Sequence, residues 1–293
     1  MRIATDIAAL QAALRALRQS GARVAFVPTM GNLHAGHHAL FARARDHAEA
    51  VVASIYVNPL QFGAEEDFGA YPRTPVQDVE ILEAAGVDLL FLPDDAQIYP
   101  RGRAAHTRVE VPGLSDILCG QFRPGHFRGV TTVVSRLLNL VAPDVALFGK
   151  KDYQQWLLIR LMVSDLGLPI EIIGLDTLRA ADGLALSSRN RYLTPDERRR
   201  APRLYATLNE LAGQMHGPGK VIPTLEAQAQ QALQTAGFRP DYVSVRRQAD
   251  LAPPAPGDRA LVILAAAWLG RARLIDNLEV ELCQDERSRA SLY

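Results

Sequence analysis

The stretch VAFVPTMGNLHAGH, residues 24–37, joins a short apolar run to a glycine-containing turn and the start of a helix. Pro28 ends the apolar run, and Gly31 and Gly36 allow a ligand to approach the backbone closely. The free N–H groups and the positive dipole end of the helix that follows favour an anion such as a phosphate chain. The stretch therefore predicts the first strand, binding turn and helix of an α/β domain.

The same alternation of apolar runs and helical patterns continues on both sides of this stretch. Strands are expected at 51–57, 89–92, 145–148 and 170–173, and helices at about 6–21, 36–49, 74–86 and 152–166. Apolar strands separated by helices indicate a parallel sheet covered on both faces. Ligands of such sheets bind at the carboxyl ends of the strands, which is where a site is expected.

The pattern changes after about residue 176. Thr194-Pro195-Asp196-Glu197 has the capping, proline and acidic signals of a helix start, and Gly217-Pro218-Gly219 is expected to be a turn before a further helix. Strands are expected at 242–245, 260–267 and 273–280. We therefore expect an α/β domain over 1–176 and a smaller α+β C-terminal lid domain over 177–293.

Composition excludes several classes of protein. The chain has 293 residues, 32 Lys+Arg and 32 Asp+Glu, and 48% of its residues are hydrophobic. These values exclude a disordered chain and argue against a dedicated nucleic-acid binder, which normally carries a basic excess.

Cysteine usage and apolar runs predict the compartment. Cys119 and Cys283 are far apart and form no CxxC motif, so a disulfide framework or structural zinc is not expected, and a reducing cytoplasm fits. The longest apolar stretch, 260–269, is too short to cross a bilayer as a helix, so no membrane association is expected.

Polar residues follow the first two strands. His34 and His37 can donate hydrogen bonds to phosphate oxygens, although the same pair also suits an ordinary turn and helix cap, and a metal site lacks a third ligand nearby. Asn58 and Gln61 suit the hydroxyl or carboxylate groups of a small substrate, or simply a turn before Pro59.

Three later segments have similar alternatives. Residues 123–130 form an anion-approach loop or a basic surface turn, and residues 184–190 a mobile loop closing over phosphates or a plain linker. In residues 148–155 a lysine can hold phosphate as a point charge. Asp152 can cap the helix, hold Mg²⁺ or accept a hydrogen bond from a ribose. Jointly, the segments suit a nucleotide plus a small acid.

Taken in order, these segments closely resemble the pantothenate synthetase (pantoate–β-alanine ligase) family of the HxGH nucleotidyltransferase superfamily. The matching segments are residues 28–37, 56–62, 123–134, 149–155, 182–192 and 269–277, and His34-Ala35-Gly36-His37 is the superfamily signature. Ser187-Ser188-Arg189 looks like the counterpart of the second, mobile signature of class I aminoacyl-tRNA synthetases.

The resemblance implies an α/β protein with a Rossmann-like parallel sheet domain and a smaller α+β C-terminal domain. It implies ATP-dependent condensation of pantoate with β-alanine through a pantoyl adenylate, with release of AMP and pyrophosphate. It also implies a cytoplasmic homodimer that uses Mg²⁺, with ATP, pantoate and β-alanine as its small-molecule partners and no nucleic acid.

The resemblance also implies residue roles. The expected catalytic residues are His34, His37, Lys151 and Arg189, with His37 at the position usually assigned as proton donor. The expected ATP-binding residues are Met30, Gly31, Asn32, Leu33, His34, Ala35, Gly36, His37, Gly149, Lys150, Lys151, Asp152, Leu178, Leu186, Ser187, Ser188 and Arg189. Gln61, Gln155, Asn58 and Arg123 are expected on the substrate side, and no protein metal site is expected.

The chain departs from the family pattern at three positions. Leu186 stands where Met is common, His38 where Leu is typical, and Asn32 where Ala is common. Leu and Met have similar volumes, so the contact at Leu186 should survive.

Two other functions fit the sequence less well. A nucleotidyltransferase making a nucleotide-linked product is disfavoured, because Gln61 and Gln155 are retained and no motif for a second nucleotide is found. A non-enzymatic nucleotide sensor or RNA binder disagrees with the neutral charge and with the retained His, Lys and Ser-Ser-Arg residues. An assay of ATP-dependent pyrophosphate release separates an enzyme from a binding protein.

Overall fold

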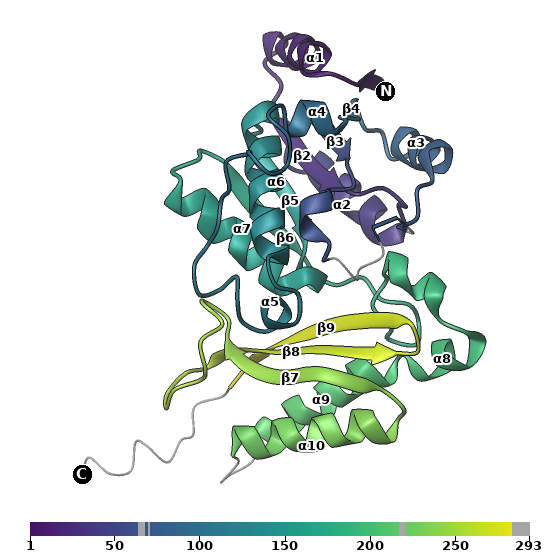
Figure 1. Cartoon of the computed structure of the whole chain (residues 1–293), viewed down its shortest axis with the longest axis vertical. Coiled ribbons are helices and arrows are strands. Elements are labelled where there is room, and N and C mark those ends of the chain that lie inside the picture. The colour runs from purple at the N-terminus through teal and green to yellow at the C-terminus, as the bar shows by residue number, and fades with distance from the viewer. Residues whose placement is uncertain (64–67, 70, 217–220, 283–293) are drawn as a thin grey trace. The chain divides into compact units, whose positions relative to one another are not determined.

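The computed structural model describes residues 1–63, 68–69, 71–216 and 221–282 (Figure 1). The chain divides into two compact units. The first comprises Met1–Leu178 with Leu186–Ser188, and the second comprises Arg179–Ala185 with the chain from Arg189 onward. The turn expected at 217–219 and Cys283 lie outside the described residues.

A six-stranded parallel sheet forms the centre of the first unit. Its strands, in spatial order, are β1 (Arg2–Ala4), β4 (Leu89–Phe91), β3 (Ala50–Ile55), β2 (Val24–Thr29), β5 (Val145–Gly149) and β6 (Glu171–Leu175). Strands β3 and β4, which follow β2 in the chain, lie on one side of β2, and β5 lies on its other side. The strand order therefore reverses between β2 and β5, the position at which such sheets bind ligands.

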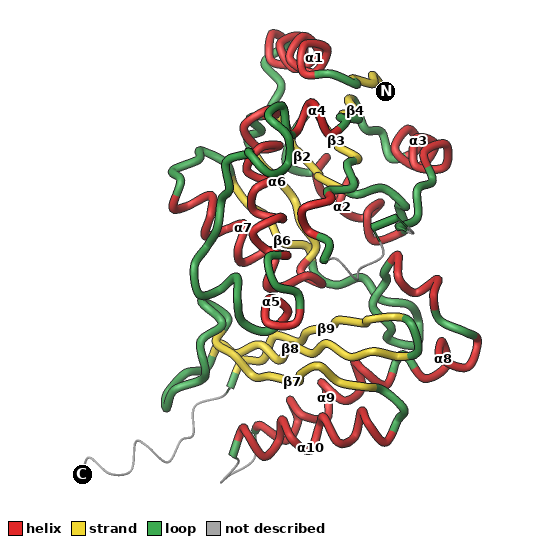
Figure 2. The backbone as a smooth tube through the Cα atoms, in the orientation of Figure 1, coloured by secondary structure: helices red, strands yellow, loops and turns green. Residues whose placement is uncertain are grey.

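Helices connect these strands, as Figure 2 shows by colour. They are α1 (Ile7–Gln19), α2 (Ala35–Arg45), α3 (Pro75–Ala84), α4 (Asp95–Ile98), α5 (Cys119–Phe122), α6 (His126–Val141) and α7 (Tyr153–Asp165), with single 3₁₀ turns at η1 (Pro59–Gln61) and η2 (Lys150–Asp152). Asp6 caps α1 by accepting the Ala9 N–H at 2.8 Å, and Pro75 occupies the first position of α3.

Both faces of the central strands are buried. Val27, Val51 and Leu147 pack with Phe41 of α2 and Leu82 of α3 in one apolar cluster. The alternate residues of the same strands point to the opposite face and are also fully buried: Phe26, Val52 and Ala146. The predicted Rossmann-like parallel sheet covered on both faces is therefore confirmed.

The second unit is an antiparallel sheet packed against helices. Its strands are β7 (Arg239–Arg247), β8 (Ala260–Leu269) and β9 (Ala272–Glu281), with β8 in the middle, and its helices are α8 (Pro195–Arg200), α9 (Arg203–Met215) and α10 (Ile222–Thr235). Leu261 and Ile263 of β8 share a core with Leu208 of α9 and Leu233 of α10. This is the smaller α+β domain that the sequence predicts.

The helix start expected at Thr194 is also present in the second unit. Thr194 and Glu197 make reciprocal capping bonds at the start of α8. None of the helices within the described ranges combines the length and apolar character needed to cross a membrane.

Candidate active site

The loop after β2 is held in place by a buried carboxylate on α3. Asp78 is 2% exposed and accepts the N–H groups of Asn32 at 2.9 Å and Leu33 at 2.8 Å. A Cβ on Gly31, whose φ is +76°, would lie 2.9 Å from the Asp78 carboxylate. This position therefore requires glycine, and the two hydrogen bonds to Asp78 hold the backbone of the next two residues in place. No sequence motif marks Asp78, which the sequence reasoning missed.

His34 and His37 form a reciprocal cap at the start of α2. Nδ1 of His34 accepts the Gly36 N–H at 3.1 Å, and Nδ1 of His37 accepts the His34 N–H at 3.2 Å. A neutral imidazole that accepts at Nδ1 carries its proton on Nε2. Both rings, whose centroids lie 4.2 Å apart, therefore have an Nε2–H to donate. The capping role and the phosphate-binding role, alternatives from the sequence alone, are compatible.

Both histidines are neutral at physiological pH. Burial, followed by the positive charge of Lys151, lowers the pKa of His34 to about 4. Burial, followed by the neighbouring His34, lowers the pKa of His37 to about 3. As neutral rings, they are suited to donate hydrogen bonds rather than to contribute full positive charges.

The segment after β5 contains the lysines. Lys150 lies 3.2 Å from an Asp176 carboxylate oxygen, and its ammonium is 5.5 Å from the centroid of the Trp156 ring. Lys151 lies 3.8 Å from the Asp152 carboxylate and acts electrostatically on His34. Lys151 therefore lies close enough to act electrostatically on both histidines across the β2–β5 boundary.

A second group of polar residues follows β3. Gln61 is 8% exposed, and its Nε2 lies 2.9 Å from Sδ of Met30. Its backbone carbonyl oxygen is 2.8 Å from Nδ1 of His126 and 3.4 Å from the Arg123 guanidinium. The structure therefore brings Gln61 and Arg123, both expected on the substrate side, together with His126 and with Met30, which was expected at the nucleotide.

The two adjacent glutamines of α7 have different surroundings. Gln154 is 4% exposed; it accepts the Cys119 N–H and donates to the carbonyl oxygens of Leu114 and Ile117. Its amide therefore binds the backbone of the first residue of α5 and of the loop before it. Gln155 is half-buried on the first turn of α7. This division favours Gln155 as the substrate-side residue.

Leu186–Ser188 belongs to the first unit and contacts the loop after β2. The Leu186 N–H donates to the Leu178 carbonyl at 2.9 Å, and the Ser188 hydroxyl lies 3.5 Å from the Asn32 carbonyl oxygen. Both contacts lie inside the first unit, so part of the Ser-Ser-Arg segment joins the loop that carries the histidines. Arg189 begins the return of the chain to the second unit.

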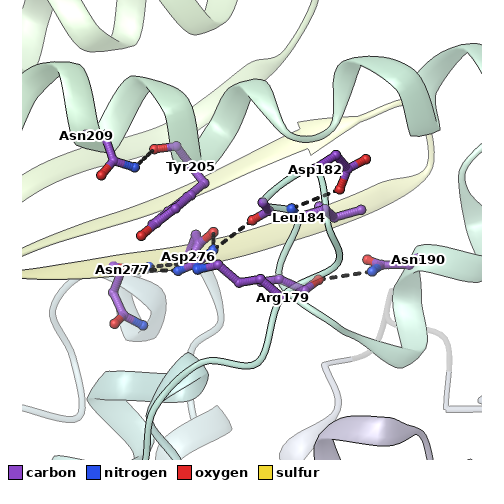
Figure 3. A network of polar contacts seen from close by, with 10 residues as sticks. Arg179, Asp182, Leu184, Asn190, Tyr205, Asn209, Asp276 and Asn277 are labelled. Atoms are coloured by element: carbon purple, nitrogen blue, oxygen red, sulfur yellow. Dashed lines mark hydrogen bonds and ion pairs between the residues drawn. The ribbon is translucent and has the colours of Figure 1, made fainter.

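A buried ion pair holds the hairpin that precedes this segment (Figure 3). Arg179 donates to both carboxylate oxygens of Asp276, at 2.7 and 2.8 Å, and to the Gly183 carbonyl at 3.1 Å. Its guanidinium lies 3.3 Å from the centroid of the Tyr205 ring. Sequence reasoning missed this pair, although Asp276 lies in one of the segments that resemble the family.

The described residues contain no cluster of three or more His, Cys, Asp or Glu side chains arranged to hold a metal ion. Mg²⁺ does not require such a cluster, because it is commonly held by one or two carboxylates together with substrate phosphates. The exposed Asp152 carboxylate, next to Lys151, is chemically suited to that role.

Comparisons with known proteins show which family the chain resembles over nearly its whole length. The family model described as pantoate-beta-alanine ligase matches residues 2–279. The chain is 58% identical over 275 residues to a pantothenate synthetase of Thioalkalivibrio sulfidiphilus, covering 94% of this chain and 96% of that protein. It is 55% identical over 282 residues to one from Pseudomonas aeruginosa, covering 96% and 100%.

Solved structures are similar over nearly the whole chain. Pantothenate synthetase from Thermus thermophilus has a TM-score of 0.88 at 47% identity, covering 96% of this chain and 100% of that one. Pantoate-beta-alanine ligase from Francisella tularensis, complexed with beta-gamma ATP and beta-alanine, has a TM-score of 0.79 at 34% identity, covering 95% and 97%.

Proposed function

Since the chain belongs to the pantoate-beta-alanine ligase family, we propose that this ligase condenses pantoate with β-alanine through a pantoyl-adenylate intermediate, releasing AMP and pyrophosphate. One observation carries the proposal. The imidazoles of His34 and His37 and the Lys151 ammonium gather where the strand order reverses, and Gln61 lies in the turn that follows the neighbouring strand. The Francisella relative, complexed with an ATP compound and beta-alanine, supports both substrates.

The first step activates the carboxylate. A pantoate carboxylate oxygen attacks the α-phosphorus of ATP, the bond from that phosphorus to the bridging oxygen breaks, and pyrophosphate leaves. Negative charge grows on the pyrophosphate side, and donors placed there lower the barrier. The Nε2–H groups of His34 and His37 and the Lys151 ammonium are the donors we assign, with Ser187, Ser188 and Arg189 closing over the phosphates.

Mg²⁺ would neutralise phosphate charge when it is bound with the nucleotide, and Asp152 is the carboxylate we assign to hold it. This chain's own residues position the nucleotide and pantoate. The remaining residues of the loop, Met30–Gly36, line the nucleotide with Gly149, Lys150, Leu178 and Leu186, while Gln61, Gln155 and Arg123 hold pantoate. Such positioning supplies much of the rate where little covalent chemistry falls to the protein.

The second step forms the amide. The neutral amine of β-alanine attacks the acyl carbon of the adenylate, the bond from that carbon to the bridging oxygen breaks, and AMP leaves with the oxygen. The amine loses a proton as the amide forms. Water would compete for the same carbon, so exclusion of water from the site matters to yield.

Isotope exchange tests the adenylate directly. With pantoate and Mg²⁺ but without β-alanine, the enzyme should exchange labelled pyrophosphate into ATP, because the first step needs only the carboxylate and the triphosphate. With ¹⁸O in the pantoate carboxylate, one label should appear in AMP after turnover. Label in inorganic phosphate together with ADP would show attack on the γ-phosphorus and overturn the proposal.

We also propose that the ligase works as a homodimer in the cytoplasm, on small molecules alone, without a nucleic-acid or membrane partner. The family resemblance supports the homodimer and the cytoplasmic location, and the zero net charge argues against a nucleic-acid partner. Sedimentation velocity measures the dimer, and a sedimentation coefficient expected for a 32.0 kDa monomer at micromolar concentration would contradict it.

A further inference from the structure

The Asn58 side chain makes every hydrogen bond that a carboxamide can make, and all four partners belong to the protein. Its oxygen accepts the Leu60 N–H at 3.2 Å and the Tyr99 hydroxyl at 2.6 Å. Its nitrogen donates to the Gly129 carbonyl at 3.1 Å and to Oε1 of Gln61 at 3.2 Å. Asn58 is 1% exposed, so its amide has no group left for a substrate, and the substrate-side role expected for Asn58 from the sequence can only be an indirect one.

Backbone groups determine which way the Asn58 amide points. The Leu60 N–H can only donate, so it requires the oxygen, and the Gly129 carbonyl can only accept, so it requires the nitrogen. Gly129 allows this close packing because a Cβ there would lie 2.3 Å from the Leu60 carbonyl oxygen. The orientation of Asn58 follows from chemistry alone.

That orientation determines the next amide in turn. The second hydrogen of the Asn58 nitrogen faces Gln61, so Gln61 must present its oxygen to Asn58. The Gln61 nitrogen then faces away, toward Met30, with its hydrogens directed to the loop after β2. Gln61 therefore offers donors, which suit a carboxylate or hydroxyl oxygen.

The hydroxyl of Tyr99 holds Asn58, the first residue in this series of hydrogen bonds. Tyr99 follows α4, is 2% exposed, and makes the shortest of the four bonds to Asn58. Burial raises the pKa of Tyr99 well above its usual value, so the hydroxyl keeps the proton that it donates. Without that hydroxyl, Asn58 would be held only by bonds of 3.1–3.2 Å.

We infer that Tyr99 is a positioning residue for pantoate: by holding in place the Asn58 amide, whose direction the backbone sets, it keeps the Gln61 amide positioned with an N–H toward a substrate oxygen. The inference rests on the proposed function for the identity of the substrate. The hydrogen-bond relay itself, Tyr99–Asn58–Gln61, does not depend on that identity.

Tyr56 provides a matched control. It is also a buried tyrosine, 7% exposed, and its ring centroid lies 6.4 Å from that of Tyr99. Its hydroxyl donates to Asp95 at 2.8 Å rather than to Asn58. Tyr56→Phe and Tyr99→Phe thus remove the same atom from similar surroundings, and only the second change touches the relay.

The first measurement is direct binding of pantoate and of ATP to both variants by calorimetry. Tyr99→Phe should raise the Kd for pantoate by about 5- to 10-fold, while Tyr56→Phe changes it less than 2-fold, and the Kd for ATP should change less than 2-fold in either. The pantoate KM should rise more than kcat falls. Equal effects of the two variants on pantoate would overturn the inference.

A double-mutant cycle tests whether Tyr99 acts through Gln61. In a Gln61→Ala background, Tyr99→Phe should weaken pantoate binding less than 2-fold further. A further loss as large as in the wild-type background would mean that Tyr99 acts by another route.

A ligand-free readout separates this inference from the proposed function. The side-chain amide resonance of Gln61, assigned by its loss in Gln61→Ala, should shift in Tyr99→Phe and stay in place in Tyr56→Phe. That pattern with no pantoate binding by the wild type would refute the proposed substrate and leave the relay standing. An unmoved resonance in Tyr99→Phe would refute the relay whatever the substrate.

Discussion

At the residue scale, the site depends on hydrogen bonds that orient a few polar groups. His34 and His37 are fixed by each other and by the helix start, and Gln61 is fixed by Asn58. The HAGH signature made the histidines predictable from sequence. Asp78 and Tyr99 were not predictable, because each acts on a loop far away in the chain and neither lies in a local motif.

The low pKa values of the two histidines predict a loss of stability in acid. Each pKa is lowered on folding from 6.5, so the unfolded chain takes up protons first as the pH falls. The stabilisation is fully present above pH 6.5 and is lost toward pH 4 and below. For His37 the loss between pH 7 and 4.5 should be about 1–3 kcal/mol.

Urea unfolding across that pH range measures this loss of unfolding free energy. His37→Gln should show a flatter dependence of unfolding free energy on pH than the wild type. An equally steep dependence in the variant, or an NMR titration of His37 near pH 6.5, would contradict the assignment.

The two neighbouring lysines should differ in their effect on the first step. Lys151→Met should slow adenylate formation by roughly 10²-fold, because it removes a charge next to the developing pyrophosphate. Lys150→Met should slow it less than 5-fold, since Lys150 is held by Asp176 and Trp156. Single-turnover measurements compare the two variants, and equal losses would show that both lysines share the phosphate charge.

At the element scale, most strands and helices were predictable because their apolar periodicity is clear. The runs at 24–27 and 145–148 lie in buried strands, as do residues 89–91 of the run at 89–92. β1 was missed, since three residues at the edge of a sheet carry no period to detect. Its pairing with β4 is a tertiary contact that only the folded chain reveals.

A buried ion pair joins the hairpin Arg179–Ala185 to Asp276 of β9. Removing one partner of a buried ion pair costs about 3–5 kcal/mol, because the other charge is left without compensation. Asp276→Ala should therefore lower the unfolding free energy of the second unit by roughly that amount. Glu210→Ala, which breaks the exposed pair with Arg203, should cost about 0–1 kcal/mol.

The two tryptophans allow this test to be made unit by unit. Trp156 lies in the first unit and Trp268 in the second, and the chain has no other. In a Trp156→Phe background, fluorescence reports the second unit alone. An Asp276→Ala midpoint in urea no lower than that of Glu210→Ala would show that the buried pair contributes little to stability.

At the scale of the whole molecule, sequence reasoning gave the succession of elements and their chemistry but not their neighbours in space. Strand order decides that the loops after β2 and β5, more than 110 residues apart, meet at one edge of the sheet. The segments were expected at strand ends from the general rule for parallel sheets. Which strand ends are adjacent is set by packing across the sheet, and no single segment encodes it.

The chain crosses between its two units three times, after Leu178, after Ala185 and after Ser188. Neither unit is therefore one uninterrupted length of chain. A gene fragment that stops at Leu178 would encode the complete six-stranded sheet yet omit Leu186–Ser188, including the hydroxyl that lies against Asn32. If the two halves were expressed separately, the first unit would lack three residues that the other half carries. Complementation by that half, rather than independent folding, would then restore the contact of Ser188 with the loop after β2.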